Sequence, residues 1–271
     1  MPRPVLFRIA LSGVALSLVA GCREKGPAPG AIALQISVRH ASEPAAVAVA
    51  PAGRPSNRAA LVYADSFVAQ GRDTIFLRRV RLVLMEMAIA PSVANECEEE
   101  QGEDNPPCVD FQEAAAVVEL PLGHGTVTRS AEPAPATVYN LFQLIIHKAD
   151  SHQDSTLIRA NPELDGASVR VDGVLSRGGK RHDFVFVTPF NEQEEIALEP
   201  AVAVPSHDTL HLTLRVDVGS WFTSGDHQLL LDPASAAEGG PNEHTVKDNI
   251  RTSLRVFRDA NRDGLNDDNA P

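Results

Sequence analysis

The chain has 271 residues, of which 43% are hydrophobic and 22% are charged, so it can bury a core and is not disordered as a whole. The 24 Lys and Arg residues against 36 Asp and Glu residues give a net charge of −12, which argues against a nucleic-acid-binding protein. Three cysteines are too few for a miniprotein held together by disulfides.

The N-terminus has the layout of a secretion signal. Arg3 and Arg8 lie just before an apolar run over 9–20. A run of about a dozen residues is shorter than the roughly 20 that span a bilayer, and it suits the hydrophobic segment of a signal peptide. These residues predict that the chain is exported.

The next four residues, Val19-Ala20-Gly21-Cys22, resemble the lipobox of bacterial lipoproteins. The resemblance implies that residues 1–21 are removed and that Cys22 carries the acyl chains, palmitate among them. Two or three acyl chains anchor a protein stably in a membrane. Arg23, in place of an aspartate, favours the outer over the inner membrane by resemblance to enterobacterial sorting. The alternative is an ordinary signal peptide with a chance cysteine.

Cys97 and Cys108 remain once Cys22 is lipidated. An oxidising periplasm would join them into a disulfide that closes a short acidic loop. Metal binding through these thiols is the alternative, but no second cysteine pair or nearby histidine completes a tetrahedral site. The sequence therefore predicts a disulfide.

A tether over 22–30 precedes a series of segments with strand character, interrupted by long loops over 42–58 and 95–110. The predicted strands are 32–38, 74–89, 117–120, 138–147, 168–174, 184–188, 195–204 and 209–218. Arg177-Gly178-Gly179-Lys180 predicts a hairpin turn. Short strands separated by turns are typical of an antiparallel β-sandwich, here over 31–241.

The pattern changes over 242–271. Val246, Ile250, Leu254 and Phe257 recur at helical spacing, which predicts a helix over 243–257 with Asn242 as its N-cap. The expected fold is therefore mainly β, with a C-terminal helix and an acidic loop.

The acidic loop matches the pattern D-x-N-x-D-G-x-x-D, which places several oxygen atoms around one point. The expected ligands are Asp259, Asn261, Asp263, the Leu265 carbonyl and Asp267, and oxygen ligands of this kind suit calcium. The loop resembles the first half of an EF-hand, but it lacks the bidentate glutamate and the exit helix. It is closer to loops of thrombospondin type 3 and dockerin modules. The alternative is a solvated acidic tail.

Other candidate groups have ordinary structural explanations. His207 and His211 are about 13 Å apart if they lie on one strand, too far for a shared metal. Glu192, Glu194 and Glu195 are expected to be solvated acids near a hairpin. Trp221-Phe222 is expected to pack in the core, with a sugar-stacking platform as the alternative.

Two further stretches, 138–148 and 168–233, together with the lipobox and the acidic loop, resemble a family of uncharacterised bacterial envelope lipoproteins. The resemblance covers about half of the chain. It implies a β-sandwich ectodomain of transthyretin-like or immunoglobulin-like type, and it supplies no catalytic residues.

The sequence predicts a non-enzymatic, lipid-anchored envelope protein that binds a protein or glycan partner and is stabilised by calcium at its C-terminal end. Two alternatives remain. One is an envelope hydrolase or carbohydrate-active enzyme whose carboxylates meet only in the folded chain, and the other is a periplasmic metal-handling protein.

Overall fold

The computed structural model describes residues 29–38, 65–68, 73–93, 97, 107–122, 126–224 and 229–269. The expected signal peptide, Cys22, most of the tether, the loop over 42–58 and most of the loop over 95–110 lie outside the described residues. Within those ranges, no helix is both long and apolar enough to cross a membrane.

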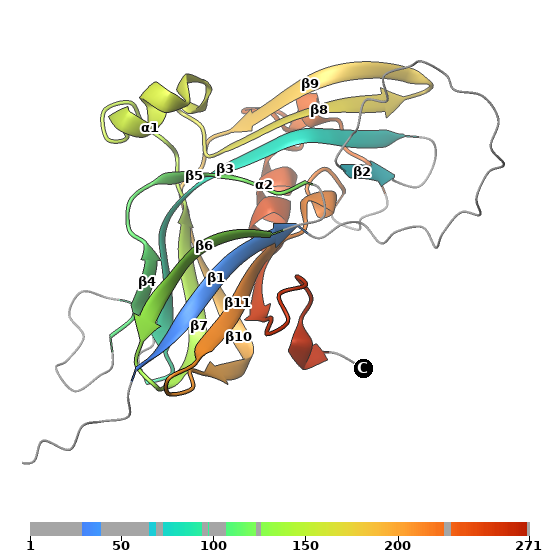
Figure 1. Ribbon diagram of the computed structural model, residues 1–271. Helices are drawn as coiled ribbons and strands as arrows, with labels where there is room; N and C mark the ends of the chain where they lie inside the picture. Colours follow the sequence, from blue (N-terminus) through green and yellow to red (C-terminus); the bar gives the residue numbers. More distant parts are fainter. Residues whose placement is uncertain are drawn as a thin grey trace, which may run out of the picture.

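Strands dominate the structure and form two sheets (Figure 1). The four-stranded sheet has the order β12 (Leu254–Arg258), β11 (Thr209–Val216), β1 (Gly30–Val38) and β6 (Thr126–Ala134). The eight-stranded sheet has the order β10 (Glu192–Ala203), β7 (Val138–Ile146), β3 (Thr74–Pro91), β8 (Val169–Arg177) and β9 (Lys180–Thr188). Its other members, β2 (Asp65–Val68), β4 (Val109–Gln112) and β5 (Ala116–Glu119), pair with β3. The prediction of a mainly β chain is confirmed.

The sheets are not purely antiparallel. β1 runs parallel to β11 and antiparallel to β6, whereas the other strand pairs in the described part are antiparallel. The expectation of an all-antiparallel arrangement is therefore wrong at one pair. A parallel pair requires a long connection, and most of the chain lies between these two strands.

β3 is the long strand predicted near residue 74, and it organises the larger sheet. On one edge it pairs with β8 over 74–82 and with β7 over 84–91, while β2, β5 and β4 follow one another along the opposite edge. The register shifts between Met85 and Ala88, where Glu86 has a φ of 52°. This bulge bends the strand between its two sets of neighbours.

The turn between β8 and β9 was predicted from its two glycines. Gly178 and Gly179 have φ values of 56° and 78°, and Arg177 pairs with Lys180 across the turn. Positive φ at both central residues matches the twist of a two-residue hairpin, so this prediction is confirmed.

One hydrophobic cluster takes side chains from both sheets. It joins Ile32, Leu34 and Leu212 of the smaller sheet to residues such as Leu77 and Phe142 of the larger one. A second, small cluster around Val83 lies where β7 and β8 diverge from β3. The alternation of apolar residues in β1 and β11 explains which face of the smaller sheet joins the core.

The helices are short. They are α1 (Ser155–Ala160), η1 (Pro162–Leu164), η2 (Val218–Ser220), η3 (Pro233–Ala236), α2 (Glu243–Thr252) and η4 (Asp267–Asn269). α2 is shorter than predicted, because the helix ends before Ser253 and the chain continues as strand β12 beside β11. Leu254 faces the core and Phe257 lies on the opposite face of β12, so their helical spacing is coincidental.

Candidate functional site

The loop after β12 closes around Asp259, the first residue predicted to bind calcium. Asp259 is fully buried, and its Oδ2 accepts hydrogen bonds from Gln35 Nε2 at 2.7 Å, Thr213 Oγ1 at 2.6 Å and the Gly264 N–H at 2.9 Å. Gly264 has a φ of 81°, a backbone conformation that glycine adopts readily. Gln35 belongs to β1 and Thr213 to β11. Asp259 therefore joins the loop by hydrogen bonds to the face of the smaller sheet that points away from the core.

The other predicted ligands bond to the backbone of the loop. The Asp263 N–H donates to Asp259 Oδ1 and to Asn261 Oδ1, at 3.0 Å each. Asp263 Oδ1 in turn accepts from the Leu265 N–H at 2.8 Å. Asp267 Oδ2 accepts from a backbone N–H near the start of the loop at 2.6 Å.

In the described part of the chain, no group of three or more His, Cys, Asp or Glu residues is placed to hold a metal ion. Asp259 Oδ2 accepts three hydrogen bonds, and Oδ1 accepts one, from the Asp263 N–H. The loop therefore closes through hydrogen bonds, and calcium binding at these residues stays a prediction from the sequence pattern.

Cys97 and Cys108 lie at disulfide distance. Their Sγ atoms are 2.12 Å apart and their Cα atoms 5.8 Å apart, so the predicted pairing is confirmed. The Cys97 N–H also donates to Gln143 Oε1 on β7 at 3.0 Å. The crosslink therefore holds the segment before β4 close to β7.

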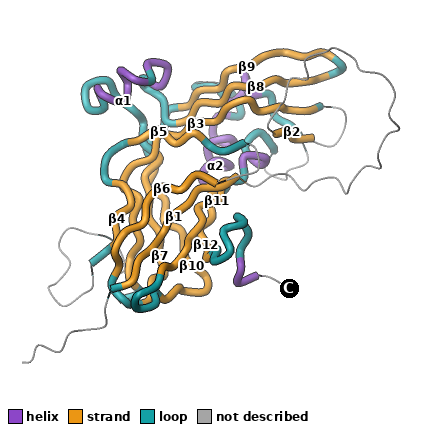
Figure 2. Tube along the Cα trace, viewed as in Figure 1, coloured by secondary structure: helices purple, strands orange, loops and turns teal. Residues whose placement is uncertain are grey.

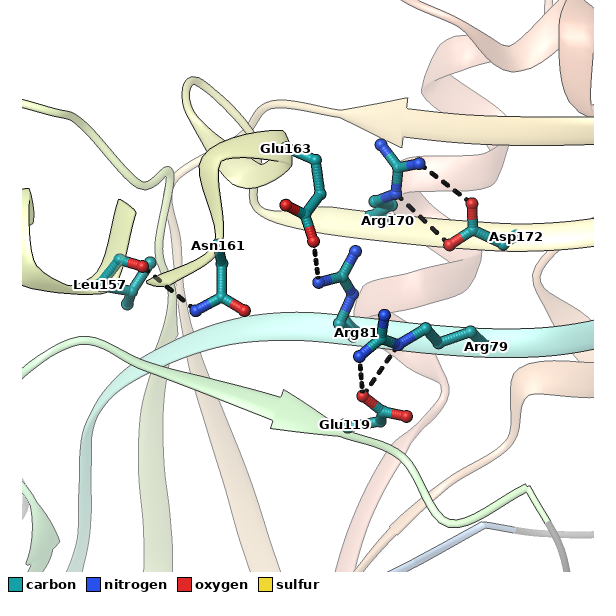
Figure 3. Close-up of polar contacts among 8 residues, drawn as sticks. All are labelled: Arg79, Arg81, Glu119, Leu157, Asn161, Glu163, Arg170 and Asp172. Atoms are coloured by element: carbon teal, nitrogen blue, oxygen red, sulfur yellow. Dashed lines mark hydrogen bonds and ion pairs between the residues drawn. The ribbon is translucent and has the colours of Figure 1, made fainter. Parts of the chain in front are cut away.

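Three ion pairs gather on β3 and β8 beside η1 (Figure 3). They are Arg79 with Glu119, Arg81 with Glu163, and Arg170 with Asp172. No local sequence pattern links these residues, because the partners are 40 and 82 positions apart in two of the three pairs.

Arg81 is the buried member of this group, with a side chain only 3% exposed. Its hydrogen bond to Glu163 lowers the pKa of that carboxyl below its ordinary value. Arg81 Nε is buried without a hydrogen-bond partner among the described residues. The pair of Arg81 with Glu163 joins β3 to η1. Each of the three arginines has an acidic partner, so the group has no net charge with which to attract a charged ligand.

A cleft of about 890 Å³ opens beside the edge strands of the two sheets. β10 ends the order of the larger sheet, β12 ends that of the smaller one, and the two lie close together (Figure 2). The remaining walls come from β11, the C-terminal end of α2 and Asn266 in the loop after β12. Since ligand sites are commonly concave and of this size, the cleft is the candidate functional site.

One wall of the cleft is basic. Arg215 of β11 and Arg255 of β12 are directly opposite in the antiparallel register and therefore share one face. The Arg215 guanidinium lies 4.8 Å from the centre of the Phe257 ring, and Arg255 Nη1 donates to the carbonyls of Thr252 and Leu254. Two arginines at one cross-strand position make this wall of the cleft basic.

The opposite wall is acidic and belongs to β10. Glu195 and Glu199 are exposed along it, whereas Glu194 is largely buried and bonds Arg251 of α2 at 2.6 Å. This bond raises the pKa of Arg251 above its ordinary value. The expectation that Glu194 is merely solvated is therefore wrong, because the carboxylate joins β10 to α2.

The remaining candidates have structural roles. Trp221 is fully buried, and its Nε1 donates to Ser253 Oγ at 2.9 Å, which confirms core packing rather than a sugar platform. His207 occupies a turn with a φ of 63°, and His211 follows on β11. Neither belongs to a metal-binding group in the described residues.

The cleft residues Arg215, Arg251 and Arg255 were missed at the sequence level. They come from three elements that are separate in the chain, and no spacing pattern links them. Only the β11–β12 register and the position of α2 bring them together.

No family model, curated protein or solved structure gives a significant match to the chain. The resemblance to bacterial envelope lipoproteins therefore stays a prediction.

Proposed function

We propose that the chain is a lipid-anchored protein of the bacterial cell envelope that binds a polypeptide partner in the cleft between β10 and β12. The cleft carries this proposal, since it combines the edge strand β10, which is exposed at alternate residues, with walls of opposite charge. A polypeptide can use both features, because its main chain pairs with strand edges while its side chains supply charges. Burial of Trp221 removes the main argument for a glycan.

The architecture that we propose is a β-sandwich completed by the C-terminal helix and loop. Its support is the single hydrophobic cluster to which both sheets contribute. Binding, rather than catalysis, is the role favoured by the cleft. Glu194 and Asp248, two of the carboxylates that line the cleft, form ion pairs with Arg251. A carboxylate held in an ion pair is less suited to acid–base catalysis.

The proposed location depends on Cys22 and its lipobox, and Arg23 favours the outer membrane. The Cys97–Cys108 pair supports an oxidising compartment. Growth of expressing cells with labelled palmitate should label the protein, and Cys22→Ser should abolish the label and release the protein from membranes. A label that persists in Cys22→Ser would contradict lipidation at this residue.

Partner binding is tested by photocrosslinking in living cells. A photoreactive p-benzoylphenylalanine replaces Glu195 in the cleft or, as control, exposed Lys180 at the turn between β8 and β9. We expect discrete crosslinks to protein from position 195 and none of the same size from position 180. The same products at both positions, or no product at either, would contradict a polypeptide site in the cleft.

A further inference from the structure

The tether meets the fold at one end of the sandwich. Gly30 begins β1 there, and the Ala31 N–H donates to the Asp208 carbonyl, in the turn between β10 and β11, at 3.0 Å. Two further segments lie at the same end, one after β3 and one between β6 and β7 (Figure 1). We call the described residues of these segments the tether end: Gly30, 91–93, 135–138 and 203–208.

Backbone hydrogen bonds connect the segments of the tether end. The Ser92 N–H donates to the Val138 carbonyl at 2.8 Å, which joins the segment after β3 to the turn between β6 and β7. The Val204 N–H donates to the Thr137 carbonyl at 3.0 Å, which joins that turn to the one between β10 and β11. The tether end is therefore one connected surface rather than a set of separate loops.

The tether end is apolar and carries little charge. Val93 and Val138 are 61% and 39% exposed, and they are two of the five large hydrophobic residues that are exposed in the described part of the chain. Ala203 and Pro205 are exposed at the same end. Asp208 is the one acid among the residues of the tether end, which include no Lys or Arg, and its Oδ1 accepts a hydrogen bond from the next backbone N–H at 2.7 Å.

This composition differs from that of the chain as a whole, which has a net charge of −12. An acidic surface is repelled by anionic lipid headgroups. An apolar surface without net charge can instead bury its side chains at the boundary between headgroups and acyl chains. Among the surfaces of this acidic protein, the tether end therefore suits contact with lipid.

The length of the tether keeps this surface close to the anchor. Cys22 and Pro29, the first residue that the structure describes, are seven positions apart. A chain of that length reaches at most about 25 Å when it is fully extended. Acyl chains on Cys22 would therefore keep the tether end near the lipid, whatever path the tether takes.

We propose that the tether end is a membrane-contact surface, and that Val93 and Val138 enter the boundary between headgroups and acyl chains of the membrane that holds Cys22. This inference rests on the proposed function, because it requires acyl chains at Cys22. Two valines give only a weak contact, since binding at a membrane interface grows with the apolar area that is buried. The anchor therefore holds the protein at the membrane, and the valines set which end of the fold faces it.

The test measures quenching of a fluorophore by lipid. The full-length lipidated protein carries Val93→Cys, which is the one reactive thiol because Cys22 is acylated and Cys97 and Cys108 form a disulfide. The labelled protein is reconstituted in vesicles of phosphatidylethanolamine and phosphatidylglycerol whose acyl chains bear a nitroxide. Val185→Cys is the matched control, since Val185 is a valine of β9 that is 56% exposed. The nitroxide should quench the fluorophore about twofold at position 93 and little at position 185. Equal quenching at the two positions, or none at position 93, would overturn the proposal.

A charge at the second valine tests whether the apolar pair makes the contact. Val138→Asp should reduce the quenching at position 93 about twofold, because a carboxylate is costly to place among acyl chains, whereas Val185→Asp should leave it unchanged. Quenching that does not respond to Val138→Asp would contradict the role of this residue.

Flotation of the same vesicles tests the anchor separately. Protein that does not float with the vesicles would contradict lipidation, and the membrane contact with it. Protein that floats, but whose fluorophore at position 93 is not quenched, would contradict the membrane contact alone and leave the proposed anchor in place.

Discussion

Gln35 and Asp259 are separated by 224 positions in the chain, yet Gln35 Nε2 donates a hydrogen bond of 2.7 Å to the buried carboxylate of Asp259. Thr213 completes the group, since its hydroxyl donates to Asp259 Oδ2 and accepts from Gln35. A carboxylate that is fully buried is stable only when such donors replace its water. The C-terminal loop is therefore attached to the sheet by a specific polar contact rather than by apolar packing.

Replacement of Asp259 by alanine should destabilise the protein by about 3 kcal/mol, because Gln35 and Thr213 would keep buried donors without an acceptor. Urea unfolding measures this loss. Asp183→Ala is the control, since Asp183 is exposed, pairs with Arg78 at the surface and should cost about 0.5 kcal/mol. Similar losses in the two variants would contradict the role assigned to Asp259.

Calcium should raise the thermal unfolding midpoint, because the sequence pattern of the C-terminal loop predicts a calcium site. An ion that binds the native state stabilises it and raises Tm. Thermal unfolding in calcium and in EDTA measures the shift. No shift, or the same shift in Asp263→Ala, would contradict calcium binding at these residues.

The strands that the sequence predicted are those with clear alternation or a long apolar run. β1, β3 and β11 have buried residues at the expected positions, and the glycine pair predicted the β8–β9 turn. β6 was missed because its sequence, TVTRSAEPA, has little apolar alternation and contains Pro133. Proline is tolerated there because β6 lies at the edge of its sheet, beside β1.

The candidate site was less accessible to prediction than the fold. β12 was predicted as part of a helix, because Leu254 and Phe257 continue the helical spacing of α2. The sequence around Ser253 contains no glycine or proline that would indicate the end of a helix. Without β12 there is no register to place Arg255 opposite Arg215. A cleft formed by strand pairing between distant segments depends on topology, which a single sequence does not specify.

The contribution of Glu163 to stability should depend on pH. Arg81 lowers the pKa of Glu163 below its ordinary value of 4.5 in the folded state. The stabilisation is therefore present above the unfolded pKa and is lost as the pH falls through the folded one. The difference in unfolding free energy between the wild type and Glu163→Gln should be constant near neutrality and shrink below about pH 4.5.

Urea unfolding at several pH values measures this difference. Glu113→Gln is the control, since Glu113 is exposed in the turn between β4 and β5. A difference for Glu163→Gln that does not shrink in acid would mean that its carboxylate does not stabilise the contact with Arg81.

Loss of the Cys97–Cys108 crosslink should lower stability by about 3 kcal/mol, the loop-closure value for residues 11 positions apart. The double variant Cys97→Ser, Cys108→Ser should lose this amount in urea unfolding. Reductant should destabilise the wild type to the same extent and leave the double variant unchanged. Wild-type stability that is insensitive to complete reduction would contradict a stabilising crosslink.

Tyr139 should ionise only at high pH. It is fully buried, its hydroxyl donates to the Pro135 carbonyl at 3.3 Å, and burial raises its pKa to about 12. Since the unfolded state releases this proton near pH 10, stability should fall as the pH rises from about 10 to 12, and Tyr139→Phe should remove this fall. The chain has two tyrosines, so Tyr63→Phe isolates the signal in an absorbance titration. In that variant the native protein should titrate near 12 and the urea-unfolded protein near 10, whereas a native transition near 10 would mean that the hydroxyl reaches water.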